Sequence, residues 1–118
     1  MPVLNYRELH AWQRAMDLVE SVYRMTNDWP GEERFGLTSQ VRRASVSVPA
    51  NIAEGQGRTI TGEFLNHLSI AHGSLREVET HLLIAQRLDY CDIAACEPVM
   101  GQTAEVGRLR QGLMRSLR

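Results

Sequence analysis

The sequence predicts an all-α protein: one antiparallel, up-down-up-down four-helix bundle spanning residues 1–118. Apolar residues recur every three or four positions in four long segments, which is the spacing of a single helix face. Glycine, proline and aspartate mark short connections between these segments, and short connections join antiparallel neighbours in a bundle. No strand-like alternation of useful length appears. With 43% hydrophobic and 23% charged residues, the composition is that of one ordinary globular domain.

The first helix is expected over about residues 6–28. Asn5 and Glu8 have the spacing of a capping box, with Asn in place of Ser or Thr. The Trp-Pro-Gly run at 29–31 then ends the helix. Its expected apolar face comprises Leu9, Trp12, Met16, Val19, Tyr23 and Thr26, widened by Ala15 and Val22.

The second helix is expected from Leu37 or Thr38 to the glycines at 55 and 57. Pro49 falls inside it and lacks the amide hydrogen that would bond the Ser45 carbonyl. We therefore expect a kink or a short break at Pro49. The expected core face comprises Leu37, Val41, Ala44, Val48 and Ile52.

The third helix has the strictest four-three spacing in the chain. Glu63 lies in its first turn, where the helix dipole favours an anion. Gly73 lies in the middle at a cost of about 1 kcal/mol relative to Ala, which predicts close approach of a neighbouring helix. The expected face comprises Phe64, Leu68, Ala71, Leu75, Val78, Leu82 and Ala85.

The fourth helix is expected to begin between Asp92 and Pro98, because a helix tolerates proline best in its first turn. Its expected face comprises Cys96, Val99, Thr103, Val106, Leu109, Leu113 and Leu117. Cys91 and Cys96 lie near the preceding turn and form no CxxC motif. We expect them to stay reduced, as in a cytoplasmic protein.

The net charge of −1 argues against a general polyanion binder. All 13 basic residues are arginine, which suits bidentate contacts with phosphate and carboxylate groups. The alternative explanation for the absence of lysine is the codon usage of a GC-rich genome, which favours arginine. Residues 1–9 lack the apolar region of a signal peptide, and no apolar run approaches the ~18 residues that a membrane span needs.

Two further strips flank the core face of the second helix. Its far side carries small apolar residues where a solvated helix would carry charge, which predicts a subunit interface; a bland surface is the alternative. The residues of this expected interface are Val46, Pro49, Ala50 and Ala53. The other strip is polar and comprises Gln40, Arg43, Ser47, Asn51, Glu54 and Arg58.

The polar strip has two interpretations. It is either a ligand or partner site, or a structural element in which Asn51 binds the carbonyl that Pro49 frees or fixes the packing register. Arg43, Glu54 and Arg58 would then form a salt-bridge network.

Arginines near the C-terminus share one helix face. Repeated around a cyclic oligomer, they would form a basic rim that attracts nucleic acid. The alternative is a solvated face, with cations favoured by the helix dipole. The candidate contact residues are Arg42, Arg43, Arg58, Arg108, Arg115 and Arg118.

No known catalytic or metal motif occurs. None of the glutamates has a histidine three residues on, as a di-iron bundle requires, and HExxH is absent. GxSxG, phosphate-loop and dinucleotide fingerprints are also missing. We therefore predict no catalytic residue, metal ligand or cofactor, and we do not expect an enzyme.

Several motifs together resemble a known family. They are Trp12-Gln13, Phe35-Gly36-Leu37, the runs 40–44 (QVRRA) and 47–55 (SVPANIAEG), Glu63-Phe64, and the run 73–79 (GSLREVE). The chain is similar to the four-helix bundle family named for 23S rRNA intervening sequences, also called S23 ribosomal-protein-like. The resemblance implies a homopentameric ring or barrel. It also implies kinship with accessory variability proteins of diversity-generating retroelements, which bind a reverse transcriptase and nucleic acid through basic surfaces.

The leading hypothesis is a non-catalytic oligomeric scaffold. Its expected partners are further copies of the chain, together with RNA, DNA or a nucleic-acid-processing protein. No interaction with a membrane is expected. The alternative is a protein–protein interaction module without a nucleic-acid role.

Overall fold

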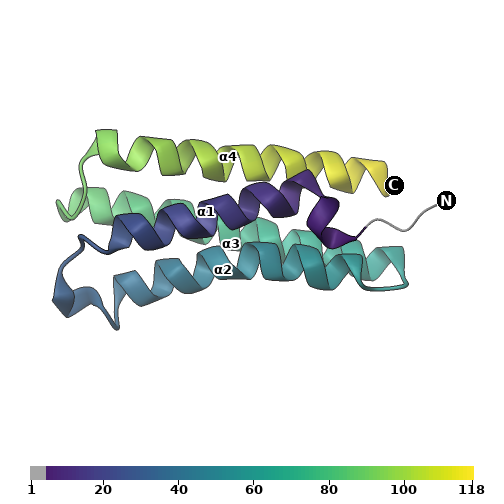
Figure 1. Cartoon of the computed structure of the whole chain (residues 1–118), viewed down its shortest axis with the longest axis horizontal. Helices are drawn as coiled ribbons and strands as arrows, with labels where there is room; N and C mark the ends of the chain where they lie inside the picture. The colour runs from purple at the N-terminus through teal and green to yellow at the C-terminus, as the bar shows by residue number, and fades with distance from the viewer. Residues whose placement is uncertain (1–4) are drawn as a thin grey trace.

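The computed structural model describes residues 5–118 and shows four long helices over that range. They are α1 (His10–Thr26), α2 (Leu37–Gln56), α3 (Thr61–Arg87) and α4 (Ile93–Ser116). Two single-turn 3-10 helices, η1 (Tyr6–Glu8) and η2 (Gly31–Glu33), precede α1 and α2. Successive helices run in opposite directions, so that η1 and the C-terminal end of α4 lie at the same end of the bundle (Figure 1). The predicted fold class is confirmed.

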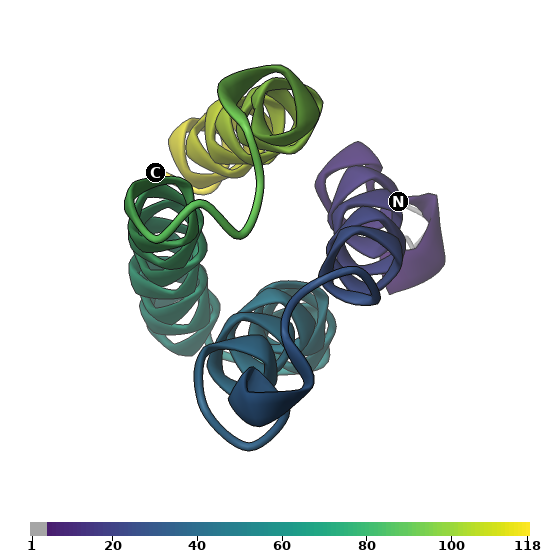
Figure 2. The same ribbon diagram turned by 90° about the vertical axis from the view of Figure 1, so that its left-hand side faces the viewer.

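The four helices surround one core. α1 packs against α2 and α4, and α3 packs against the same two helices. Among the described residues, the diagonal pairs α1–α3 and α2–α4 make no backbone contact, as the end-on view shows (Figure 2). This closed square is the up-down-up-down order that short connections predict.

The predicted core faces of α2, α3 and α4 point inward. All five predicted core residues of α2 are buried, and so are six of the seven predicted for α3; Phe64 is partly buried. In α4 the face is buried as far as Val106, and Leu109, Leu113 and Leu117 are partly buried. Helical periodicity alone therefore placed most of the core.

The first helix differs from its prediction at both ends. Leu9 has extended backbone (φ −73°, ψ 125°), so η1 and α1 are separate and α1 begins at His10. The Asn5 side chain accepts a hydrogen bond from the Arg7 amide at 2.9 Å and thus caps η1 and not α1. The helix ends at Thr26, two residues before the predicted end.

The buried face of α1 is also shifted relative to the prediction. Large residues of the predicted face, Met16 and Tyr23, are exposed. Ala15, Val22 and Thr26 of the predicted face are buried, together with Ala11 and Leu18, which the prediction left out. Hydropathy favours the large side chains, but small side chains at the contact allow neighbouring helices to approach closely.

Proline interrupts neither α2 nor α4. α2 continues through Pro49 without the short break that we expected, and the kink stays a prediction. Pro98 lies in the second turn of α4 and not in the first, because the helix already begins at Ile93 after its N-cap Asp92. The carbonyl that Pro98 leaves without its helical partner belongs to Ala94, an exposed residue, so water can satisfy it.

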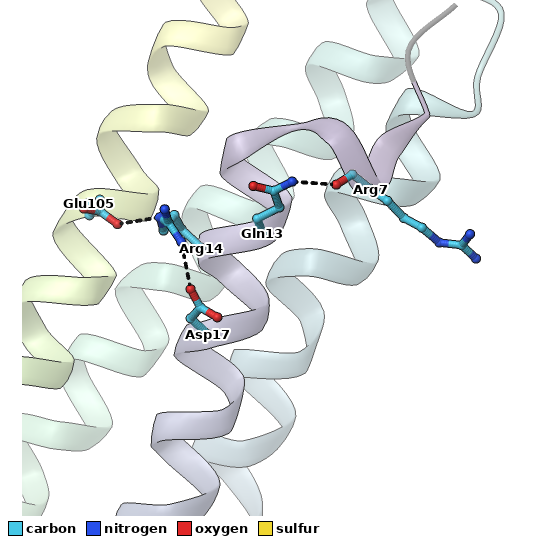
Figure 3. A network of polar contacts seen from close by, with 5 residues as sticks. All are labelled: Arg7, Gln13, Arg14, Asp17 and Glu105. Carbon is cyan, nitrogen blue, oxygen red and sulfur yellow. Dashed lines mark hydrogen bonds and ion pairs between the residues drawn. The ribbon is translucent and has the colours of Figure 1, made fainter.

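Polar contacts join α1 to its neighbours at the bundle surface (Figure 3). Arg14 lies 3.5 Å from Glu105 of α4 and 3.1 Å from Asp17 of its own helix. Gln13 donates a hydrogen bond to the Arg7 carbonyl at 2.9 Å and so fixes η1 against α1. These side chains are about half exposed, so each ion pair contributes little to stability.

A carboxylate caps α2 from the preceding loop. Glu33 accepts a hydrogen bond from the Leu37 amide at 3.0 Å and another from the Tyr90 hydroxyl at 2.6 Å. Both bonds favour the ionised carboxylate, so they lower the pKa of Glu33, with the Leu37 bond the larger cause. The bond to Glu33 is also the main reason that the pKa of Tyr90 is raised. The two residues tie η2 to the α3–α4 turn.

Cys91 and Cys96 form a disulfide across the α3–α4 turn, which corrects the expectation of free thiols. Cys91 lies in the α3–α4 connection and Cys96 in the first helical turn of α4. Their Cα atoms are 6.6 Å apart, a separation that a disulfide can span. Sequence spacing did not suggest this, because the two cysteines are five positions apart and no CxxC motif is present.

Close helix approach occurs at a different glycine from the one predicted. A Cβ atom on Gly73 would meet nothing within 4 Å, so the expected contact there is wrong. A Cβ atom on Gly55, near the end of α2, would lie 2.7 Å from the His67 Cβ atom and 2.9 Å from the Phe64 ring. The absence of a side chain at Gly55 lets the C-terminal end of α2 pack against α3.

Candidate partner-binding surfaces

The middle of the predicted polar strip is used to pack α2 against α3. Asn51 donates to the Ser47 carbonyl at 2.9 Å and to the Ser47 hydroxyl at 3.0 Å. The Ser47 hydroxyl also accepts a hydrogen bond from Ser74 at 2.8 Å, and the Asn51 carbonyl oxygen lies 3.0 Å from Nδ1 of His67. The four side chains form a polar chain between the helices. Asn51 bonds Ser47 and not the carbonyl of Ser45, so its role is packing register.

The N-terminal part of the strip lines a groove of about 460 Å³ between α2 and α3. Gln40 and Arg43 contribute from α2, and Glu77 and His81 contribute from α3. Phe35 stands at this groove with 90% of its surface exposed. Burial lowers the pKa of His81, against an opposing effect of Glu77. In the described part of the chain, Nδ1 of His81 is buried without a hydrogen-bond partner.

The C-terminal part of the strip is an ion pair on the helix surface. Glu54 and Arg58 lie 3.1 Å apart, and both side chains are about half exposed. Arg58 is therefore accessible, but part of its charge is already balanced. An exposed i,i+4 pair of this kind contributes only about 0.3–0.5 kcal/mol, so a stronger acceptor could displace it.

Arg42 joins α2 to the end of α1, and its role as a partner contact stays a prediction. Its Nε donates to the Thr26 hydroxyl at 2.8 Å, and its Nη2 lies 3.2 Å from the Asn27 side-chain oxygen. Its guanidinium also lies 4.6 Å from the centre of the Tyr23 ring. With these donors and this ring face engaged, the side chain acts inside the bundle.

The expected subunit interface on α2 is only partly accessible. Val46 and Ala50 are exposed and Ala53 is partly exposed, as an unpartnered face requires. Pro49 is buried within its own chain, which corrects its assignment to that interface. Its ring fills space inside the protomer.

Two predicted contact residues on α4 and one just beyond its end are free of acidic partners. Arg108, Arg115 and Arg118 are exposed, and within residues 5–118 none of them lies at ion-pair distance from an acidic group. A spacing of seven places Arg108 and Arg115 on one side of the helix, and Arg118 lies two residues beyond its last residue, Ser116. This end of α4 therefore presents uncompensated positive charge.

The remaining arginine of α4, Arg110, was missed as a site residue because it lies inward. Arg110 is only 8% exposed and follows the buried Val106 by one helical turn. The sequence did contain a signal for the burial of Arg110. The four-three spacing of the core face continues through positions 99, 103, 106, 110 and 113, whereas the prediction placed Leu109 on that face after Val106.

Arg110 lines a groove of about 270 Å³ between α3 and α4, together with Arg76, Arg108 and His72. Its Nη1 donates to the Leu68 carbonyl at 3.4 Å and to the Met114 sulfur at 2.7 Å. In the described chain its buried Nε has no partner. Burial, followed by the charge of Arg76, lowers the pKa of Arg110.

Two negative findings apply to residues 5–118. Over that range, no three His, Cys, Asp or Glu side chains come together as metal ligands would. No helix in the same range has the length and apolar character that crossing a membrane demands.

The fold and these surfaces define a four-helix bundle whose notable polar features are grooves and arginines on its outside. Residues 7–112 match the family described as 23S rRNA-intervening sequence protein. The chain belongs to that family, which confirms the resemblance seen in the sequence. No curated protein matches the chain.

A solved structure shares the fold. It comes from Bacteroides thetaiotaomicron VPI-5482 and is described as a protein of unknown function from the S23 ribosomal protein family. It is 20% identical with a TM-score of 0.79, and the match covers 88% of this chain and 97% of that chain. Neither description names a reaction or a ligand.

Proposed function

We propose that this protein is a non-catalytic oligomeric scaffold that binds nucleic acid, or a nucleoprotein, through the C-terminal half of α4. One observation carries the proposal: Arg108 and Arg115 are exposed on one side of α4 and Arg118 is exposed just beyond its end, all without acidic partners in the described chain. Arginine in this state suits phosphate oxygens. Arg43, in the N-terminal part of the polar strip, and Arg58, at its C-terminal end, are secondary contacts in this proposal.

The family description supports a nucleic-acid setting, since it refers to 23S rRNA, although it names no ligand. Kinship with retroelement accessory proteins and a cytoplasmic location stay predictions. The net charge of −1 means that binding depends on where the arginines lie and not on the overall charge.

Replacing Arg108, Arg115 and Arg118 together by Ala is expected to weaken RNA binding and its salt dependence. Each lost phosphate contact lowers the slope of log K against log salt by about 0.7 for single strands, so the slope should become shallower by roughly 2. The measurement is fluorescence anisotropy with a single-stranded RNA between about 50 and 200 mM salt.

The matched control replaces Arg24, Arg34 and Arg87 by Ala. It removes the same charge from the opposite end of the bundle, at the ends of α1 and α3 and in the η2 loop. Unchanged binding by the control with loss in the α4 variant supports the proposal. Equal losses of RNA binding in both variants would mean that RNA is attracted non-specifically and not by the α4 surface. Absent or salt-insensitive RNA binding by the intact protein would refute the proposal.

Copies of the chain are expected to assemble through the α2 surface that bears Val46 and Ala50, five being the number that the resemblance implies. Val46→Glu with Ala50→Glu should dissociate the oligomer, because it places unpaired charges in an apolar contact. Light scattering gives the mass, with Ala94→Glu on the exposed first turn of α4 as control. A wild-type protein that is a lone protomer at working concentration contradicts assembly.

The second candidate function is a protein–protein interaction module without a nucleic-acid role. It is favoured by the 90% exposed Phe35 beside the α2–α3 groove, because an exposed aromatic side chain at a groove is typical of a protein contact. A partner captured from nuclease-treated lysate by wild type and by the α4 triple variant, but not by Phe35→Ala, would select this function over the first.

A further inference from the structure

Positive charge in the α3–α4 groove exceeds negative charge. Three arginines line it, Arg76 from α3 and Arg108 and Arg110 from α4, whereas Glu79 is its only acidic residue. Glu79 lies 2.8 Å from Arg76 and so balances one guanidinium at most. Arg108 and Arg110 have no acidic partner within residues 5–118. The groove therefore lacks a counter-anion.

The excess of positive charge also affects the pKa of a neighbouring histidine. His72 lines the groove, and its pKa is lowered by burial first and then by the charges of Arg110 and Arg76, with a smaller opposing effect of Glu79. The imidazole is thus mainly neutral at pH 7, where it can donate one N–H to an anion without adding charge.

Arg110 is the group that most needs an anion. Less than a tenth of its surface is exposed, and its protein partners are a carbonyl and a thioether, neither of which carries charge. A guanidinium removed from water without a counter-charge is costly, and this cost is relieved by a paired anion. Three guanidinium groups around one hollow match the many acceptor oxygens of a phosphate better than those of a carboxylate.

We propose that the α3–α4 groove binds one phosphate group, held between the guanidinium groups of Arg76, Arg108 and Arg110. The phosphate belongs either to a nucleic-acid backbone or to a free phosphate or phosphate monoester. Arg108 is shared with the nucleic-acid surface on α4, but the site goes beyond that function, because a free phosphate needs neither RNA nor an oligomer.

Isothermal titration with inorganic phosphate, against chloride at matched ionic strength, tests the site in the full chain. Arg108→Gln removes an exposed contact without touching the core, and Arg110→Met removes the buried charge while keeping an unbranched side chain. Each should weaken phosphate binding about ten-fold or more, as expected for a lost charged hydrogen bond. Arg87→Gln, an exposed residue of α3 outside the groove, should stay within about two-fold of wild type.

Competition identifies the source of the phosphate. Displacement by a single-stranded RNA but not by AMP indicates a backbone phosphodiester, displacement by AMP indicates a monoester, and displacement by neither leaves free phosphate as the ligand. The inference is overturned if wild type shows no saturable phosphate binding below about 10 mM, or if Arg108→Gln and Arg87→Gln bind phosphate equally. RNA binding that is insensitive to phosphate and to Arg110→Met excludes a nucleic-acid backbone as the source of the phosphate and leaves the proposed function intact. Phosphate binding without RNA binding would support the phosphate site and refute the proposed function.

Discussion

Replacing Ile52 by Ala is expected to lower the free energy of unfolding by about 2–5 kcal/mol. Ile52 lies on the inner face of α2 with 0% of its surface exposed, within the single core cluster. The substitution removes buried apolar surface and leaves a cavity that the rigid neighbouring helices fill only in part. Since small domains are stable by about 5–15 kcal/mol, this one change removes a large part of the total.

Urea denaturation at one fixed protomer concentration measures this loss. The control is Ile70→Ala on α3, where the same side chain is 45% exposed. The control should change stability by no more than about 0.5 kcal/mol. Similar losses for both variants would mean that Ile52 is not a core residue or that Ile70 is covered by another subunit.

Gly55→Ala is expected to destabilise the protein by about 1–3 kcal/mol, although alanine is the better helix former. The new methyl group would lie 2.7 Å from the His67 Cβ atom, whose position is set by the backbone of α3. It would also lie 2.9 Å from the Phe64 ring. The two helices must move apart, which also strains the hydrogen bond chain through Asn51 and His67.

Gly73→Ala is the matched control for Gly55→Ala. It should stabilise the protein by up to about 1 kcal/mol, since the methyl group meets nothing within 4 Å and the unfolded chain loses freedom. Thermal midpoints of the two variants should therefore move in opposite directions. Stabilisation by both substitutions would contradict the close α2–α3 approach.

Most of the fold could be predicted because helix periodicity depends only on neighbours along the chain. The core face of α2 is correct at every position, and those of α3 and α4 are nearly so. The exceptions share a cause. In α1 the prediction included the exposed Met16 and Tyr23 and left out the buried Ala11 and Leu18, and in α4 it favoured Leu109 over Arg110. Hydropathy scores a residue by type, whereas burial depends on which face meets a neighbouring helix.

The candidate sites were less predictable. The polar strip of α2 was found from sequence, but its division into a packing chain around Asn51, a groove at Arg43 and an ion pair at Arg58 was not. Each part depends on what α3 places opposite. Arg42 and Arg108 likewise look alike in the sequence, yet Thr26 and Asn27 of the α1 end engage only Arg42.

The sequence by itself determined the number of helices, their order, and most of the residues that face the core, because these follow from spacing along one segment. Only the tertiary structure decided which arginines remain free, which glycine lies at a close contact, and that Cys91 and Cys96 meet. These features depend on distances between groups far apart in the chain or across a turn. Such distances are set by how the helices pack, and no local pattern encodes them.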